Sequence, residues 1–111
     1  MSVYNVWVNA LENKNLEAAM ACVADDYSFV RHQTGTTMDK AALEGMLKAM
    51  MASEDVHFSE RRCVYENDDI LVEHVLVDFP DGTREAVLSV STLEDGKMTR
   101  TETGATLIKK S

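Results

Sequence analysis

The sequence contains only two cysteines, Cys22 and Cys63, among 111 residues, and they form no CxxC motif. Two cysteines are too few for a framework of disulfides, although one disulfide between them is an open alternative. Both lie in segments with an apolar pattern, so we expect buried, reduced thiols in a cytoplasmic protein. A chain of this length can bury a hydrophobic core without disulfides or metals.

Basic residues are also scarce, because 11 lysines and arginines stand against 19 aspartates and glutamates, a formal net charge of −8. An acidic surface repels phosphate groups, which argues against nucleic acid as a partner. No apolar run is long enough to span a membrane, and no basic amphipathic stretch suggests a membrane-surface helix. The N-terminus lacks the pattern of a signal peptide. We therefore expect no membrane partner.

Metal-binding spacings, repeats and linkers are absent as well. The three histidines form no HxH or HExxH motif, so we expect no metal and infer no cofactor. No repeat, linker or low-complexity tract divides the chain, and its length suits one domain. We expect a single domain over residues 1–111.

What the second half does contain is a series of four strand-like runs. Short acidic or glycine-containing turns separate them, including Asp81-Gly82 and Asp95-Gly96. Glycine readily takes the positive φ that tight turns need, so these turns predict an antiparallel meander. The expected strands are Val56–Tyr65, Ile70–Phe79, Thr83–Leu93 and Lys97–Lys109.

The first half has the pattern of helices. Apolar residues recur at helical spacing from Val3 to Ala10, and Ser2 is a suitable N-cap. Asn15 can cap a second helix, which we expect to end at Asp25-Asp26. Alternation then predicts a short strand from Tyr27, and Asp39 can cap a third helix that runs to about Ala52. Helices followed by a run of strands predict the α+β class.

Both faces of the expected strand Ile70–Phe79 are mainly apolar, whereas a sheet with one wet face alternates cleanly. Helices can cover one face, and a second copy of the chain is the simplest cover for the other. We therefore expect a homodimer through the outer sheet face. The alternative is that Glu73 faces solvent among exposed valines.

Three segments resemble the nuclear transport factor 2-like superfamily, which includes the SnoaL-like and ketosteroid isomerase-like proteins. They are Trp7–Leu16, Ala24–Phe29 and Asp95–Arg100, and the resemblance covers nearly the whole chain. It implies a cone-shaped half-barrel, in which three N-terminal helices pack on a curved, mainly antiparallel sheet. It also implies a pocket between helices and sheet and, frequently, a dimer through the outer sheet face.

The resemblance does not extend to the catalytic residues of ketosteroid isomerases. Those enzymes use a Tyr and two Asp residues, and Trp7, Arg31 and Ser89 stand at these positions here. Tryptophan donates only one N–H, arginine cannot act as a base near neutral pH, and serine is a weak acid. Ketosteroid isomerase activity is not expected.

Polar residues that could face the pocket are the candidate site. Arg31 can anchor a small acid. Alternatively, it can form an internal ion pair with Glu85 or Asp78 or face solvent at the rim of the pocket, and we favour these structural roles. His74 can act as a general acid or base, or it can be a core residue bonded to a nearby hydroxyl. The full set of pocket candidates is Trp7, Tyr27, Arg31, His74, Glu85, Ser89, Thr101 and Thr103.

Three functions are compatible with these residues. The first is binding of a small molecule without chemistry, because no complete acid–base set is present. The second is a SnoaL-like enzyme, an isomerase, cyclase or dehydratase acting on a small polar or aromatic substrate. The third is a protein-interaction module that uses the sheet face. We favour small-molecule binding in an internal pocket.

Overall fold

A computed structural model describes residues 2–109 of the chain. Three helices and six strands make up the fold, and the expected α+β class is confirmed. The elements are α1 (Val3–Glu12), α2 (Leu16–Met20), β1 (Val23–Arg31), β2 (Thr36–Asp39), α3 (Lys40–Ala52), β3 (His57–Glu66), β4 (Ile70–Asp78), β5 (Arg84–Glu94) and β6 (Lys97–Leu107). Within residues 2–109, none of the helices combines the length and apolar character needed to cross a lipid bilayer.

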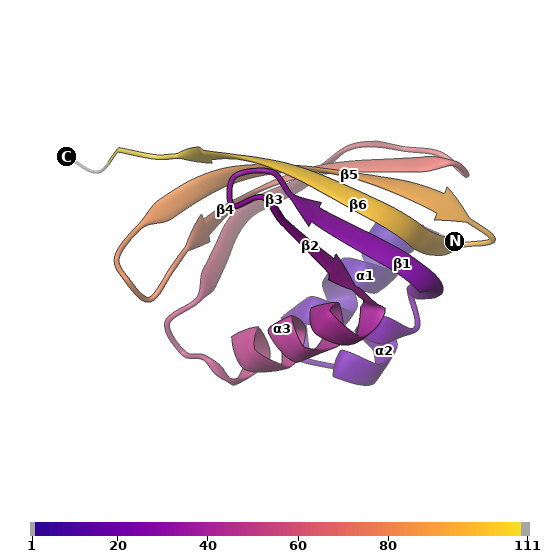
Figure 1. Cartoon of the computed structure of the whole chain (residues 1–111), viewed down its shortest axis with the longest axis horizontal. Coiled ribbons are helices and arrows are strands. Elements are labelled where there is room, and N and C mark those ends of the chain that lie inside the picture. Colours follow the sequence, from indigo (N-terminus) through magenta and orange to yellow (C-terminus); the bar gives the residue numbers. More distant parts are fainter. Residues whose placement is uncertain (1, 110–111) are drawn as a thin grey trace.

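The strands form one sheet in the order β2-β1-β6-β5-β4-β3. Neighbouring strands run antiparallel except β1 and β6, which are parallel. The sheet is curved and open, and all three helices lie on one side of it (Figure 1). We call the face toward the helices the inner face and the opposite face the outer face.

The predicted helix starts are confirmed. The side chains of Ser2, Asn15 and Asp39 accept hydrogen bonds from backbone N–H groups three residues later, at 3.0, 3.1 and 2.8 Å. The turns at Gly82 and Gly96 are also where the meander reverses, and both glycines have positive φ, 88° and 75°. Local side-chain chemistry therefore sets most of the element boundaries.

Three expectations about local structure are wrong. The second helix ends at Met20, and Val23–Asp26 already belong to β1, because Val23 is fully buried and pairs with Met98 of β6. The short edge strand β2 has no counterpart among the predicted elements. Cys63 is exposed rather than buried, whereas Cys22 is buried, and both are free thiols.

Burial along β4 identifies the two faces of the sheet. Leu71, Glu73, Val75 and Val77 are buried, while the residues between them are half-buried. Because side chains alternate across a strand, the buried set points to the inner face. Leu71 packs there in the main core with the helices, whereas Val75 and Val77 form a second cluster with Val87. The main core joins residues of all three helices to β1, β4, β5 and β6, including Ala10, Leu43 and Leu71.

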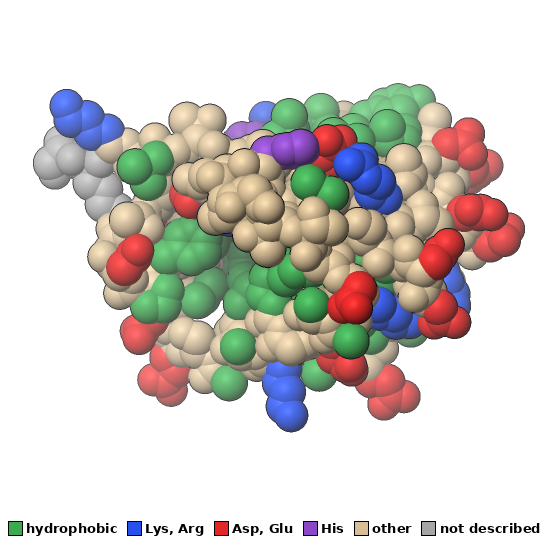
Figure 2. Space-filling model, viewed as in Figure 1, with side chains coloured by type: hydrophobic (Ala, Val, Ile, Leu, Met, Phe, Trp, Pro, Cys, Tyr) green, Lys and Arg blue, Asp and Glu red, His purple; other side chains and the backbone are tan. Residues whose placement is uncertain are grey.

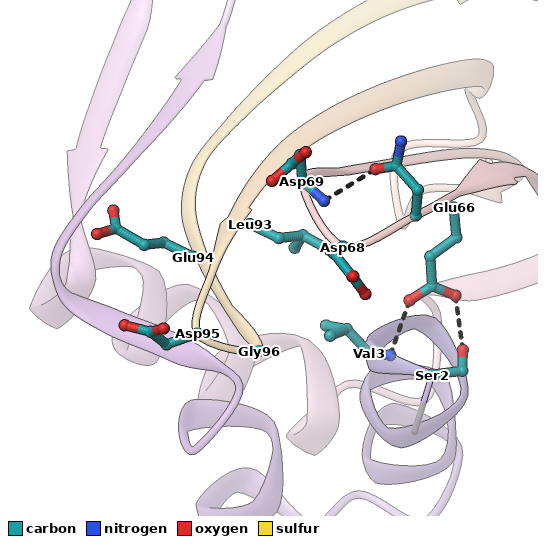
Figure 3. A pocket seen from close by; sticks show the side chains of 10 residues that line it. Ser2, Val3, Glu66, Asp68, Asp69, Leu93, Glu94, Asp95 and Gly96 are labelled. Atoms are coloured by element: carbon teal, nitrogen blue, oxygen red, sulfur yellow. Dashed lines mark hydrogen bonds between the residues drawn. The ribbon is translucent and has the colours of Figure 1, made fainter.

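The N-terminus of α1 is held by a carboxylate from the far end of β3. Glu66 accepts hydrogen bonds from Ser2 Oγ at 2.7 Å and Val3 N at 2.8 Å (Figure 3). It also accepts one from Tyr4 N at 3.3 Å. A negative charge is favourable there, because the first N–H groups of a helix are unpaired and its dipole is positive at that end. Glu66 thus docks the first helix on the sheet.

We predict that Glu66→Ala lowers the free energy of unfolding by about 1–2 kcal/mol, since it removes a cap for orphan N–H groups. Chemical denaturation of both proteins measures this loss. The exposed Glu94→Ala variant is the control and should stay near wild type. Equal stability of the Glu66 and Glu94 variants would contradict the capping role.

Candidate functional site

A cavity of about 80 Å³ lies between the helices and the inner face of the sheet. Its apolar wall comes from α1, α3 and neighbouring strands, and includes Trp7, Leu43 and Met46. Its polar wall comes from the sheet. The polar residues are Tyr27, Glu73, Ser89, Ser91 and Thr101. On the surface, hydrophobic side chains gather in a hollow beneath the sheet beside α3 (Figure 2).

Strand register places the polar residues in rows across the inner face. One row begins with Glu73 of β4, which pairs with Ser89 of β5. Ser89 pairs in turn with Thr103 of β6, and Thr103 pairs with Arg31 of β1. Directly paired residues have Cβ atoms about 5 Å apart, so each row is a ladder of neighbouring side chains. A second row contains Ser91 and Thr101.

The second row supplies linked hydroxyl groups. Ser91 Oγ and Thr101 Oγ1 lie 2.8 Å apart in a buried hydrogen bond. Burial raises the pKa of Tyr27 to about 12, although a hydrogen bond with Thr101 lowers it somewhat. All three groups are therefore neutral near pH 7 and can donate or accept hydrogen bonds.

Glu73 is the one carboxylate in the wall of this cavity, and it is only 8% exposed. Its Oε1 atom receives a long contact of 3.4 Å from Arg61 Nη1. Its Oε2 atom is buried and has no hydrogen-bond partner among the residues that the structure describes. Burial raises the pKa of Glu73, and the nearby Arg61 charge partly opposes that increase.

A β-bulge in β3 brings Arg61 to Glu73. Ser59 pairs with Leu76 and Arg62 pairs with His74, so Glu60 and Arg61 together face a single residue of β4. Glu60 has φ 51°, a left-handed conformation that is unusual for a residue other than glycine. A bulge changes the direction of side chains along a strand. The Arg61 side chain is 13% exposed, and its guanidinium lies 5.0 Å from the centre of the Phe58 ring.

The Arg31 guanidinium is already bonded to protein side chains and is not free to bind an anion. Its Nη2 atom lies 2.9 and 3.1 Å from the two carboxylate oxygens of Glu85 and 2.8 Å from Gln33 Oε1. Glu85 is buried, so this is the internal ion pair expected from the sequence. Asp78, the other proposed partner, pairs with Arg84 instead.

His74 is expected in the pocket, but the structure places it on the outer face of β4. It pairs laterally with Arg62 and with the exposed Leu88, and its strand neighbours Glu73 and Val75 point inward. The hydroxyls proposed to satisfy it lie on the inner face. His74 therefore does not line the cavity.

The other candidates divide between the cavity wall and the rest of the inner face. Trp7, Tyr27, Ser89 and Thr101 line the cavity. Arg31, Glu85 and Thr103 lie on the inner face outside the cavity wall, and Thr103 Oγ1 donates to the Val30 carbonyl at 3.2 Å. Among residues 2–109, no group of three or more His, Cys, Asp or Glu side chains is placed to hold a metal ion.

Glu73 and Arg61 are the functional candidates that the sequence analysis missed. Glu73 was visible as the single charge among Leu71, Val75 and Val77 on one strand face. Arg61 had no comparable signal. It lies in a Glu-Arg-Arg run typical of a solvated strand, and the bulge decides which arginine of that run shares the inner face with Glu73.

A larger hollow of about 620 Å³ lies at the turns that follow β3 and β5, beside the start of α1 (Figure 3). It is lined by acidic side chains, including Asp68, Asp69, Glu94 and Asp95. Its Glu66 is used in capping α1, and Asn67 Oδ1 accepts from two backbone N–H groups of the turn. These groups hold the local fold together, so we take the internal cavity as the candidate site.

Comparison with known proteins identifies the family. A family model described as a SnoaL-like domain matches residues 5–101. The chain belongs to the SnoaL-like domain family. Its fold is similar to that of nuclear transport factor 2-like proteins of known structure. A comparison with curated proteins finds no match to the sequence.

Solved structures with the same fold have distant sequences. One, described as a putative ketosteroid isomerase from Kribbella flavida, has a TM-score of 0.79 and 14% identity, over 98% of this chain and 78% of that chain. A nuclear transport factor 2-like protein of unknown function from Burkholderia xenovorans has a TM-score of 0.77 and 14% identity, over 98% and 84%. An M. tuberculosis protein described as an LEH-like epoxide hydrolase has a TM-score of 0.67 and 15% identity, over 94% of this chain and 80% of that chain. At these identities the likeness concerns the fold of the SnoaL-like domain.

We predict that Glu73 makes stability depend on pH. Its folded pKa lies above the ordinary value of 4.5, so the folded chain holds this proton more tightly than the unfolded chain. The contribution of Glu73 to the free energy of unfolding therefore falls as pH rises from about 4.5 through its pKa in the folded state. Relative to wild type, Glu73→Gln should become more stable as pH increases across that window.

Urea denaturation of wild type and Glu73→Gln at a series of pH values tests this expectation. The exposed Glu44→Gln variant on α3 is the control for removal of one negative charge. A stability difference between wild type and Glu73→Gln that stays constant with pH, or falls as pH rises, would show that burial does not disfavour the ionised carboxylate.

Proposed function

We propose that this protein binds a small, mainly apolar molecule in the cavity between the helices and the sheet. The observation that carries the proposal is the division of the cavity wall, with apolar side chains from the helices facing a patch of carboxylate and hydroxyl groups on the sheet. Ligand sites typically combine an apolar lining with a few convergent polar groups.

The size of the cavity limits what can enter it. A dry cavity of about 150 Å³ can hold benzene, and this one is about 80 Å³. Binding of a ring-sized ligand therefore requires side chains in the wall to move. Met46, which packs beside the core from α3, is suited to this because methionine is unbranched and flexible.

Catalysis on the bound molecule is the second candidate function. The supporting observation is Glu73, a buried carboxyl group with a raised pKa beside hydroxyl groups. Such groups recur at catalytic sites, where they transfer protons. The residues at the positions of the ketosteroid isomerase catalytic groups remain Trp7, Arg31 and Ser89, so that reaction is not proposed.

Trp7 provides a direct test of binding, because it is the only tryptophan and lines the cavity. We predict that titration with toluene or phenol changes Trp7 fluorescence to saturation and raises the melting temperature. Ser89→Met, which fills the cavity from the sheet, should weaken binding of both probes by about tenfold or more.

Val90→Met is the matched control, since Val90 is the next residue of β5 and points to the outer face. It should bind the probes as wild type does. The proposal fails if neither probe affects wild-type Trp7 emission or melting temperature, or if the two methionine variants behave alike.

We also propose that the outer face of the sheet joins two copies of the chain. No helix within residues 2–109 covers this face (Figure 1), although it carries half-buried Val72, Leu76 and Val90 and exposed Leu88. Its Arg84–Asp78 and Arg100–Glu102 ion pairs balance charge locally. Two copies of an acidic chain can therefore meet there without strong repulsion.

We predict that wild type sediments as a dimer at micromolar concentration and that Leu88→Asp sediments as a monomer, because it buries a charge in the interface. Leu107→Asp is the control, since Leu107 is 60% exposed and lies at the end of β6. A monomeric wild type, or a dimeric Leu88→Asp protein, would contradict this interface.

The state of the cysteines supports a cytoplasmic location. Cys22 and Cys63 are both free, and Cys63 is exposed. Exposed thiols persist most readily in a reducing compartment.

A further inference from the structure

The Oε2 atom of Glu73 points to a specific kind of ligand. Glu73 lines the cavity, and its Oε2 atom is buried and lacks a hydrogen-bond partner within residues 2–109, while Oε1 already contacts Arg61. Burying an acceptor without a partner costs stability, and a carboxylate more than most. A ligand that donates a hydrogen bond to Oε2 would remove that cost.

The charges around Glu73 determine what the donor can be. Arg61 on β3 is the cation in contact with it, and the pair has no net charge. Tyr4 on α1 and Cys63 on β3 also interact with this carboxylate. Partial loss of hydration and the charge of Glu73 raise the pKa of each, so both are neutral near pH 7. Ser89 faces it from β5 and does not titrate.

These surroundings disfavour charged ligands of either sign. An anion would meet the carboxylate, and Arg31, the other arginine on the inner face, is already paired with Glu85. An ammonium group on Oε2 would lie close to the Arg61 guanidinium and be repelled by it. A neutral hydroxyl or N–H group meets neither penalty.

We propose that the ligand of this cavity is a neutral ring-sized molecule that donates a hydroxyl or N–H hydrogen bond to Glu73 Oε2. The inference rests on the proposed binding function and adds its chemical class. The ring lies against the apolar wall of Trp7 and Met46, and the donor points to the sheet. Arg61 acts as a positioning residue, because it fixes the other carboxylate oxygen.

Phenol and toluene test the proposal, because they share a ring and differ in the donor group. Each is titrated into wild type, Glu73→Leu and Glu73→Gln, with Trp7 emission and melting temperature as readouts. Wild type should bind phenol at least about tenfold more tightly than toluene, as expected for a hydrogen bond to a charged group. Glu73→Leu should lose this preference, and Glu73→Gln should reduce it.

Glu85→Gln is the matched control, since Glu85 is also a buried inner-face carboxylate but is already paired with Arg31. It should keep the preference for phenol. The dependence of probe affinity on pH gives a second readout, which would not change if Glu73 had only a structural role. Phenol affinity of wild type should fall as Glu73 is protonated at low pH, while toluene affinity should not.

The outcomes separate the two proposals. If neither probe binds wild type, cavity binding and the ligand class both fail. If phenol and toluene bind equally, or if Glu73→Leu keeps the preference for phenol, the ligand class is overturned while cavity binding stands. Tighter binding of benzylammonium than of phenol would also overturn it, since that result requires Arg61 to leave the carboxylate charge uncompensated.

Discussion

The packing of three short helices on one face of the sheet is the constraint on which the rest of the structure depends. It decides which half of the side chains on each strand is buried. Leu71, Val75 and Val77 of β4 face inward, so Glu73 must face inward with them. The same alternation turns His74 to the other side. A buried carboxylate at this site is thus a consequence of strand register.

The bulge in β3 is the compensating feature. Counting from Ser59 without the extra residue, Arg62 rather than Arg61 would lie on the same face as Glu73, so the bulge decides which of the two arginines approaches the carboxylate. The extra residue at Glu60 and Arg61 delivers a guanidinium to one oxygen of Glu73. Bulges commonly re-aim side chains next to functional sites. Here the result is a half-satisfied carboxylate in an otherwise neutral cavity.

Much of the fold was predictable from the sequence because its signals are local. Ser2, Asn15 and Asp39 cap the helices they were expected to cap, and the Asp-Gly turns end the expected strands. The first residues of β1 and the whole of β2 were not predictable in this way. Val23 is in a strand because β6 pairs with it, and β2 exists as a short partner on the edge of β1. Pairing with distant strands overrode the local pattern.

The site was harder to predict than the fold for a related reason. Both faces of β4 are rich in valine and leucine, so composition alone does not show which face meets the helices. Choosing the wrong face exchanges His74 for Glu73. An ion pair of Arg31 with Glu85 or Asp78 was predictable because a buried guanidinium requires a carboxylate, and the structure selects Glu85. The position of Arg61 opposite Glu73 depends on the β3 bulge, which no local sequence pattern predicts.

The Glu66 cap also has a consequence for local folding and unfolding of the chain. The first turn of α1 and its capping carboxylate are separated by more than 60 residues of chain. The helix can therefore complete its end only after the β3–β4 hairpin has formed, which couples an early segment to a late one. Amide protons at Val3 and Tyr4 should exchange with solvent when that distant hairpin opens, so the start of the chain reports on the integrity of its middle.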